Sequence, residues 1–180
     1  MDDDATARLI EVTRPRAEWA ALLESAGHCR EELTSYAMAY RDVGWRDVHR
    51  IREFIDLLRA ALEQPGDPLA VRLPREAWLR HLDAFRIGVA EVRGAWVAGQ
   101  DRPDLIARFP DQLAYPSIEA SWDGLLAALP EDCRDTERVC LDCDRLLPLA
   151  QFARPGYCHD CYAAVQARYA AYQASRAARA

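Results

Sequence analysis

The sequence has no lysine, so all 23 of its basic residues are arginine. Together with abundant alanine this is typical of a GC-rich coding sequence, and it indicates no particular function. No apolar run approaches the roughly 18 residues of a membrane-spanning helix, which excludes a membrane span. The first residues, Met1–Asp4, are acidic, whereas a secretory signal begins with a basic patch and an apolar stretch. We therefore expect a cytoplasmic protein with no membrane partner.

The short motifs of the common enzyme classes are also missing. There is no phosphate-binding loop, no glycine fingerprint for a dinucleotide and no serine elbow. The histidines form no His-Glu-x-x-His spacing, and we expect His28, His49 and His81 at the surface or at the edge of a helical bundle. We therefore expect a non-enzymatic protein, with no catalytic residue and no organic cofactor.

The composition is that of a globular protein with unevenly distributed charge. A chain of 180 residues buries enough surface to fold without disulfides, so six cysteines in a reducing compartment indicate metal binding. Residues 1–138 carry 18 Arg and 26 Asp or Glu, a net charge of −8, whereas residues 139–180 carry five Arg and three Asp, a net charge of +2. The acidic part repels phosphate backbones, which disfavours broad nucleic-acid binding there.

Helical periodicity dominates the N-terminal three quarters of the chain. Apolar residues recur at alternating steps of three and four, which predicts one helix from about Pro15 to Val43, with a possible interruption at Gly27. Its stripe is Trp19, Leu22, Ala26, Cys29, Leu33, Tyr36, Tyr40 and Val43. The same spacing predicts a helix between Gly44 and Pro65, another from Pro74 to Gly99, and a shorter one from Ser117.

These segments define the expected architecture. Residues 100–116 contain three prolines and are expected to form an irregular connection with one helical turn. Short connections favour antiparallel packing, so we expect an all-α fold, with an antiparallel helical bundle over residues 1–130. A polar linker over residues 131–138 and a small four-cysteine zinc module with a C-terminal helix over residues 139–180 would follow. The narrow stripes also suit coiled-coil packing within the chain or between two chains.

Four of the six cysteines lie close together as two Cys-x-x-Cys pairs: Cys140 with Cys143, and Cys158 with Cys161. Zn²⁺ takes four sulfur ligands at tetrahedral corners about 2.3 Å away, and a two-residue spacing aims both sulfurs of a pair at one ion. The second pair opens a helix, whose N-terminal amides favour thiolates. So small a segment needs zinc for most of its folding energy. We predict one structural zinc ion held by these four cysteines.

The residues around these pairs carry a resemblance to a known family. The pattern consists of Cys-x-x-Cys, then Leu147-Pro148-Leu149, Phe152 and Tyr157-Cys158-x-x-Cys161 at a helix start. It is similar to the treble-clef zinc module of recombination endonuclease VII-like, HNH-linked proteins. The resemblance covers about residues 139–170. It implies a hairpin followed by a helix, a bound zinc ion and an association with nucleic acid. It implies no nuclease activity, because His159 is the only histidine after the linker. The resemblance does not extend to residues 1–138.

Other chemistry stays open at the cysteines. Four thiolates also suit a single iron ion or an iron–sulfur cluster, and two Cys-x-x-Cys pairs could form a redox switch. Cys133, in the linker, is either a spare ligand or a thiol without a role at the metal. His159 could hydrogen-bond a metal-bound sulfur. Cys29, on the apolar stripe, is expected to be a buried core thiol.

Two segments could bind a partner. Aromatic residues beside arginines on the C-terminal helix suit either nucleic acid or a protein interface. The candidate contacts are Arg154, Arg168, Tyr169, Tyr172 and Arg176. Residues 33–57 could also form a helix-turn-helix, although an ordinary helical hairpin is the simpler interpretation. Its second helix would present Arg46, His49, Arg50 and Arg52.

The sequence thus favours a zinc-containing interaction or regulatory protein. The helical body would offer a surface to a protein partner or to a second copy, and the zinc module would rigidify the C-terminal helix. The alternatives are a factor that binds DNA or RNA through the C-terminal helix, and a subunit that acts together with a nuclease.

Overall fold

The computed structural model describes residues 8–39, 45–100, 115–133, 137–140, 142–154 and 156–177. The chain is mostly helical and divides into two compact units, Met1–Arg134 and Asp135–Ala180. Within the described part of the chain, no helix combines the length and the apolar character that crossing a membrane requires.

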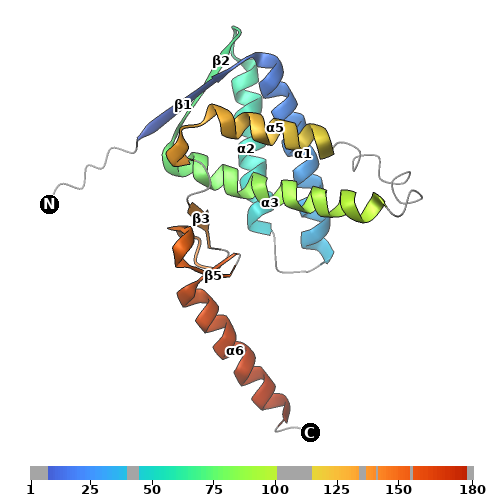
Figure 1. Cartoon of the computed structure of the whole chain (residues 1–180), viewed down its shortest axis with the longest axis vertical. Coiled ribbons are helices and arrows are strands. Elements are labelled where there is room, and N and C mark those ends of the chain that lie inside the picture. Colours follow the sequence, from blue (N-terminus) through green and yellow to red (C-terminus); the bar gives the residue numbers. More distant parts are fainter. Residues whose placement is uncertain are drawn as a thin grey trace, which may run out of the picture. The chain divides into compact units, whose positions relative to one another are not determined.

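The first unit is built mainly from two helix pairs (Figure 1). Helices α1 and α2 run side by side in opposite directions, and α3 and α5 form a second antiparallel pair that crosses the first. The expected bundle is therefore two crossed hairpins. The elements of the unit are β1 (Leu9–Arg14), α1 (Arg16–Ala39), α2 (Trp45–Glu63), β2 (Leu69–Pro74), α3 (Arg75–Gln100), α5 (Tyr115–Ala128) and the 3₁₀ helix η2 (Glu131–Cys133).

A two-stranded sheet corrects the all-α prediction for this unit. Strands β1 and β2 pair antiparallel, with Val12 opposite Val71. In both strands every second residue is buried, as in a half-buried sheet: Ile10 and Val12 in β1, Leu69 and Val71 in β2. Each strand has six residues and adjoins a much longer helical pattern, and an alternation this short is a weak signal for a strand.

The core of the first unit confirms most of the predicted apolar stripes. On α1, the stripe from Trp19 to Leu33 is buried, and the helix continues through Gly27 without a break. At the next turn Ala37 is buried and Tyr36 is only half-buried, since a 3.6-residue turn drifts away from a strict 3–4 spacing. The last two positions of that stripe lie outside the described residues, as does nearly all of the expected connection over residues 100–116.

The expected linker differs from the structure at both ends. Cys133, in η2, is fully buried in the core of the first unit. Its neighbour Asp132 accepts hydrogen bonds from Arg8, just before β1, and from Arg75, at the start of α3. Residues 137–139 form a strand, so only residues 134–136, which lie outside the described part, remain of the predicted linker.

The second unit consists of two small hairpins followed by one long helix. Strand β3 (Glu137–Val139) pairs with β4 (Leu146–Pro148), and β5 (Phe152–Arg154) pairs with β6 (Tyr157–Cys158). A single 3₁₀ turn, η3 (Leu149–Gln151), joins them, and α6 (His159–Ala177) follows β6 directly. The predicted module had one hairpin before the helix, whereas the structure has two hairpins before α6.

Candidate metal centre

The first cysteine pair lies on the tight turn between β3 and β4. The amide of Cys140 donates to the carbonyl of Arg145 at 2.9 Å, and the amide of Asp144 donates back to the carbonyl of Cys140 at 3.0 Å. Asp144 has a φ of 61°, in the left-handed region that Asp tolerates better than most residues. These bonds close the turn and aim Cys140 and Cys143 to one side of it.

The second pair spans the junction between β6 and α6. Cys158 is the last residue of β6, and Cys161 lies in the first turn of α6. Gly156, between β5 and β6, has a φ of 86°, a backbone conformation that glycine adopts readily. The junction therefore places the second pair at the N-terminal end of α6.

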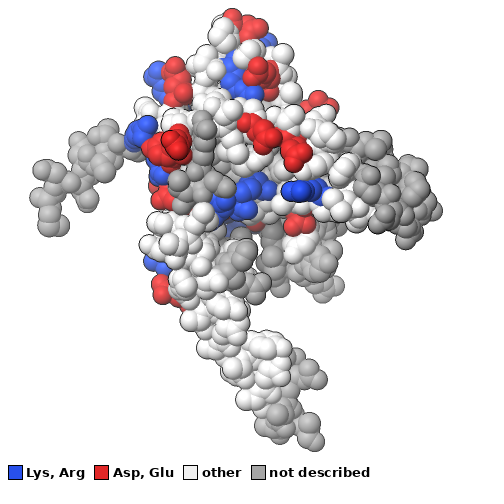
Figure 2. All heavy atoms as spheres, viewed as in Figure 1, with Lys and Arg blue, Asp and Glu red and all other residues white. Residues whose placement is uncertain are grey.

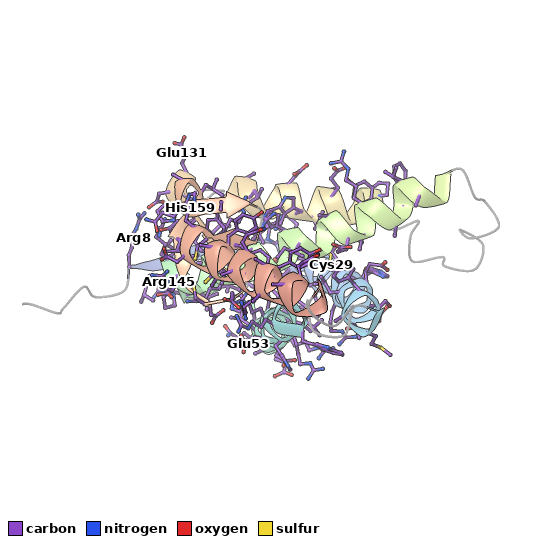
Figure 3. The ribbon with its side chains drawn as sticks, turned by 90° about the horizontal axis from the view of Figure 1, so that it is seen from below. Arg8, Cys29, Glu53, Glu131, Arg145 and His159 are labelled. Atoms are coloured by element: carbon purple, nitrogen blue, oxygen red, sulfur yellow. The ribbon has the colours of Figure 1, made fainter. Side chains whose placement is uncertain are left out.

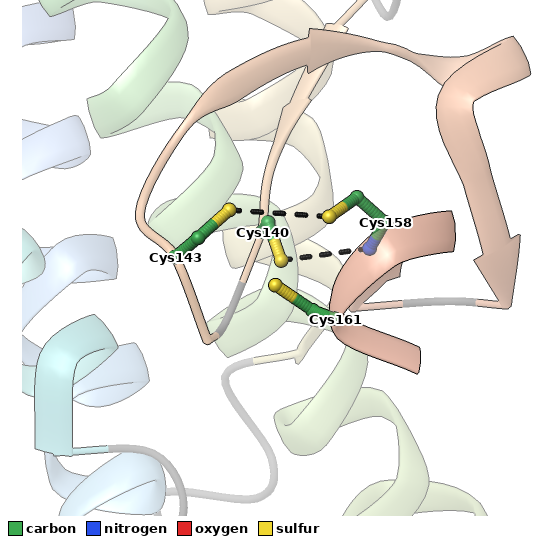
Figure 4. Close-up of side chains that lie close together, drawn as sticks. All are labelled: Cys140, Cys143, Cys158 and Cys161. Carbon is green, nitrogen blue, oxygen red and sulfur yellow. Dashed lines mark hydrogen bonds between the residues drawn. The ribbon is translucent and has the colours of Figure 1, made fainter. Parts of the chain in front are cut away.

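The four sulfurs face a common centre (Figure 4). All lie within 4.8 Å of one another, and those of Cys143 and Cys158 are 3.9 Å apart. A tetrahedron of sulfurs about 2.3 Å from an ion has edges of roughly 3.8 Å, so the cluster is close to the size of a filled thiolate site. The predicted ligands are thus brought together, and their arrangement can hold a metal ion.

Burial is uneven across the cluster. Cys140, Cys158 and Cys161 are buried, whereas Cys143 is exposed. Three partly buried apolar side chains pack against the buried sulfurs: Leu147, Phe152 and Tyr157. This apolar core is very small, so the cysteine cluster holds much of the unit's interior.

The protein surroundings favour thiolates at two of the four positions. The guanidinium group of Arg145 lowers the pKa of Cys143 to about 6. Burial by itself would raise the pKa of Cys140, but backbone N–H groups that bond its sulfur outweigh burial, and the pKa is lowered. One of these donors is the amide of Cys158, 3.5 Å from the sulfur.

The fourth position shows why the cluster suits a cation. Burial, followed by hydrogen bonds with the neighbouring cysteine sulfurs, raises the pKa of Cys161. Four crowded thiols therefore do not all ionise by themselves. A divalent cation at the centre would offset the repulsion between four thiolates, because it supplies positive charge that the four cysteines themselves do not carry.

Two charged contacts around the cluster were not predicted from the sequence. Arg145 bonds the sulfurs of Cys143 and Cys158 and also the carboxylate of Asp160. The carboxylate of Asp142, between the first two cysteines, lies 3.8 Å from Arg168 on α6. An arginine two residues after a predicted thiolate pair was the available signal, because an all-thiolate site needs nearby positive charge.

The two candidate accessory ligands take no part in the cluster. Cys133 is buried in the core of the first unit and is not among the four grouped sulfurs. His159 is exposed, and no hydrogen bond among the described residues joins its ring to the sulfurs. Cys29 is a fully buried core thiol, as expected, and burial raises its pKa (Figure 3).

The other histidines, expected at the surface or at the edge of the bundle, lie at exposed and half-buried positions. His49 is exposed, and His28 is half-buried. His81 is half-buried and stacks on Phe54, with ring centroids 5.3 Å apart, and burial lowers its pKa. No histidine belongs to the grouped metal ligands of the described chain.

The structure describes only some of the side chains predicted to contact nucleic acid or a protein partner on the second unit. Tyr169 is 59% exposed, and its hydroxyl accepts a hydrogen bond from Gln173. Arg168 is exposed but pairs with Asp142. The side chains of Arg154, Tyr172 and Arg176 lie outside the described part of the structure. Among the described side chains of α6, Tyr169 is exposed, Tyr162 is half-buried, and Arg168 is the one arginine.

One of the four residues that the possible helix-turn-helix would present, Arg50, is buried in the structure. Arg50 is only 9% exposed and donates to Asp47 at 3.1 Å, in a buried network with Asp83 and Arg86 of α3. Arg50 is therefore a buried ion-pair partner within the first unit. Residues 40–44, between α1 and α2, lie outside the described part.

No protein-family model, no curated protein and no solved structure matches this chain. The likeness of the second unit to endonuclease VII-like zinc modules therefore stays a prediction. What the structure itself supports is a cluster of four cysteines, brought together at the start of a 19-residue helix, that can hold a metal ion.

Proposed function

We propose that this chain is a zinc-dependent interaction protein without enzymatic activity of its own. In this proposal Zn²⁺ is a structural ion that stabilises the second unit, and α6 is the surface that a protein partner or a second copy of the chain binds. The observation that carries the proposal is the grouping of four cysteine sulfurs within 4.8 Å at the start of α6.

The donor set favours zinc over other ions. Four thiolates are soft ligands, which suit Zn²⁺ and iron and do not suit Mg²⁺ or Ca²⁺. With four protein ligands the shell would be complete, and a closed shell is typical of structural zinc rather than catalytic zinc. Iron bound by thiolates absorbs visible light, so colour and elemental analysis separate the two metals.

The contacts of α6 support its role as a binding surface. Tyr162 and Val165 are half-buried, whereas the described side chains beyond Val165 are exposed. In Figure 2 the visible face of α6 carries almost no charged side chains, in contrast to the first unit. A helix of 19 residues is marginally stable alone, so anchoring by the metal at its first turn would keep it ordered for a partner.

A reducing compartment such as the cytoplasm fits this proposal. The structure describes all six cysteines, and none forms a disulfide. Thiolate metal sites need reduced cysteines, which the cytoplasm maintains. We accordingly propose a cytoplasmic location.

The zinc part is tested by native mass spectrometry of the purified chain. One Zn²⁺ per chain is expected in the wild type and in Cys133→Ala, and none in the double variant Cys140→Ala/Cys158→Ala. All five tryptophans lie in residues 1–134, so their fluorescence reports only the first unit. The double variant should lose far-UV ellipticity and keep the tryptophan spectrum. Wild-type protein without zinc, or a double variant with full ellipticity, would contradict the proposal.

The partner is tested with a photo-crosslinking amino acid at position 169, the exposed Tyr on α6. Cross-links to a second copy or to one discrete protein, lost in the cysteine double variant, support the interaction role. The matched control places the same amino acid at position 149, because Leu149 is exposed and belongs to η3 rather than to α6. Absence of any cross-linked protein from position 169 would exclude α6 as the surface.

Nucleic-acid binding is the second candidate, favoured by the exposed ring of Tyr169 beside Arg168. The pairing of Arg168 with Asp142 counts against it, because a phosphate would have to replace that carboxylate. Binding of this kind weakens steeply with salt. A flat gel-shift titration at low ionic strength removes this candidate. A nuclease-associated role would require metal-dependent cleavage in the presence of the chain.

A further inference from the structure

We propose that Arg145 is a positioning residue of the metal site, whose guanidinium group holds one sulfur from each cysteine pair and balances part of the charge of the thiolates. This inference rests on the proposed zinc role and goes beyond the four ligands. It assigns a specific function to Arg145, which lies two residues after Cys143.

Arg145 contacts residues of both cysteine pairs and of α6. Its Nε lies 3.3 Å from the sulfur of Cys143, and its Nη2 lies 4.0 Å from the sulfur of Cys158. The same Nη2 donates to Asp160 in the first turn of α6 at 3.2 Å. Its carbonyl oxygen accepts the amide of Cys140 at 2.9 Å. One residue therefore ties the β3–β4 turn to the start of α6, where His159 is labelled in Figure 3.

The charge of the site explains why an arginine suits this position. Four thiolates around a divalent cation leave a net charge of −2, and three of the four cysteines are buried. Hydrogen bonds from a cation to the sulfurs compensate that charge without adding a ligand. The planar guanidinium group presents its donors in a fixed fork that suits two sulfurs and a carboxylate at once, whereas the ammonium group of a lysine is a compact point charge without that geometry.

A nearby arginine provides a matched comparison. Arg168 belongs to the same unit and pairs with Asp142 at 3.8 Å, but the structure gives it no contact with a sulfur. Both arginine side chains are more than half exposed, so removing either one costs the unit the same charge and little packing. A difference between the two variants therefore reports the contact with the sulfurs.

The experiment compares Arg145→Gln, Arg145→Lys and Arg168→Gln in the full chain. Zn²⁺ affinity is measured by competition with a chromogenic chelator, and Co²⁺ is used as a spectroscopic probe of the sulfurs. Loss of outer contacts to metal ligands typically lowers affinity about 10–100-fold. We expect a loss of that size for Arg145→Gln, a smaller loss for Arg145→Lys, and less than about a threefold change for Arg168→Gln.

The Co²⁺ spectrum separates a role at the sulfurs from a general loss of stability. Removing a hydrogen-bond donor from a thiolate should shift the sulfur-to-cobalt absorption band in Arg145→Gln and leave it unchanged in Arg168→Gln. Equal affinities and identical spectra for the two glutamine variants would overturn the inference while leaving the zinc proposal intact. A wild-type chain that binds no zinc would instead overturn the proposed function itself.

Discussion

The indole nitrogen of Trp78, on α3, lies 3.1 Å from the carbonyl oxygen of Ile10, on β1, and both residues are buried. The indole of Trp19, on α1, makes the equivalent bond to the carbonyl of Leu69, on β2, also at 3.1 Å. Each strand of the small sheet thus accepts a hydrogen bond from a core tryptophan. These bonds fix the sheet to the helices in a particular register.

Replacing Trp78 by Phe should destabilise the first unit. The change removes the donor to Ile10 and leaves unfilled volume in a closely packed core, which together should cost about 1–3 kcal/mol of unfolding free energy. The measurement is urea unfolding followed by the fluorescence of the remaining tryptophans. Trp45→Phe is the control, since Trp45 is 41% exposed and its replacement should change stability by less than about 0.5 kcal/mol. Equal stability of the two variants would show that the Trp78 bond contributes nothing.

Gly88 marks a close approach of α3 to α1. A Cβ atom there would lie 2.6 Å from the Cβ of Cys29, closer than two carbon atoms can pack. Gly88→Ala should therefore lower the unfolding free energy by about 1–3 kcal/mol, despite the better helix propensity of alanine.

Gly94, in a later turn of α3, is the natural control for this prediction. A Cβ atom there meets nothing within 4 Å, so Gly94→Ala should stabilise the unit by about 0.5–1 kcal/mol. Thermal or urea unfolding of both variants gives the sign directly. A stabilising effect of Gly88→Ala would contradict the prediction, because it would mean that α1 and α3 leave space for a Cβ atom at position 88.

Asp47 should make the first unit more stable as the pH falls from 7 to 5. Burial raises the pKa of Asp47 to about 6, and the neighbouring Asp83 adds to the rise, while Arg50 and Arg86 oppose it. The folded state then binds a proton more tightly than the unfolded state, so protonation stabilises the fold by about 1 kcal/mol over this range. Asp47→Asn should remove that part of the slope. Tryptophan fluorescence is the readout, and an unchanged slope in the variant would refute the assignment to Asp47.

The turn that carries the first cysteine pair should be sensitive to the residue at position 144. Asp144 has a left-handed backbone conformation, and a β-branched residue there is strained. Asp144→Val should cost about 1–2 kcal/mol, which corresponds to a roughly tenfold weaker Zn²⁺ affinity. Asp144→Gly, which relieves strain, should bind zinc at least as well as the wild type. Chelator competition measures both, and a valine variant with wild-type affinity would contradict the prediction.

The cysteine cluster and most of the core could be predicted because their signals are local. Two residues between Cys140 and Cys143 already require a tight turn, and the structure supplies one closed by backbone hydrogen bonds. The apolar stripe from Trp19 to Leu33 likewise follows from helical geometry alone. Such features depend on neighbours a few residues away.

The features that could not be predicted depend on contacts between distant residues. Strand β1 pairs with β2 across the whole of α1 and α2 in the sequence, and so short an alternation carries too weak a signal to reveal this. Arg50 resembled a surface arginine until α3 was seen to supply Asp83 and Arg86 to the same buried network as Asp47. The position of Arg145, two residues after Cys143, signals positive charge near the thiolates, but the sequence does not indicate that this side chain folds back onto a sulfur.

The pairing of Arg8 with Asp132 brings the beginning and the end of the helical unit to one place. A unit whose two ends adjoin can be inserted into a surface loop of another protein, or given new termini elsewhere, without stretching its backbone. A circularly permuted version of the first unit, with a short peptide that joins the regions of Arg8 and Asp132, should therefore retain the fold.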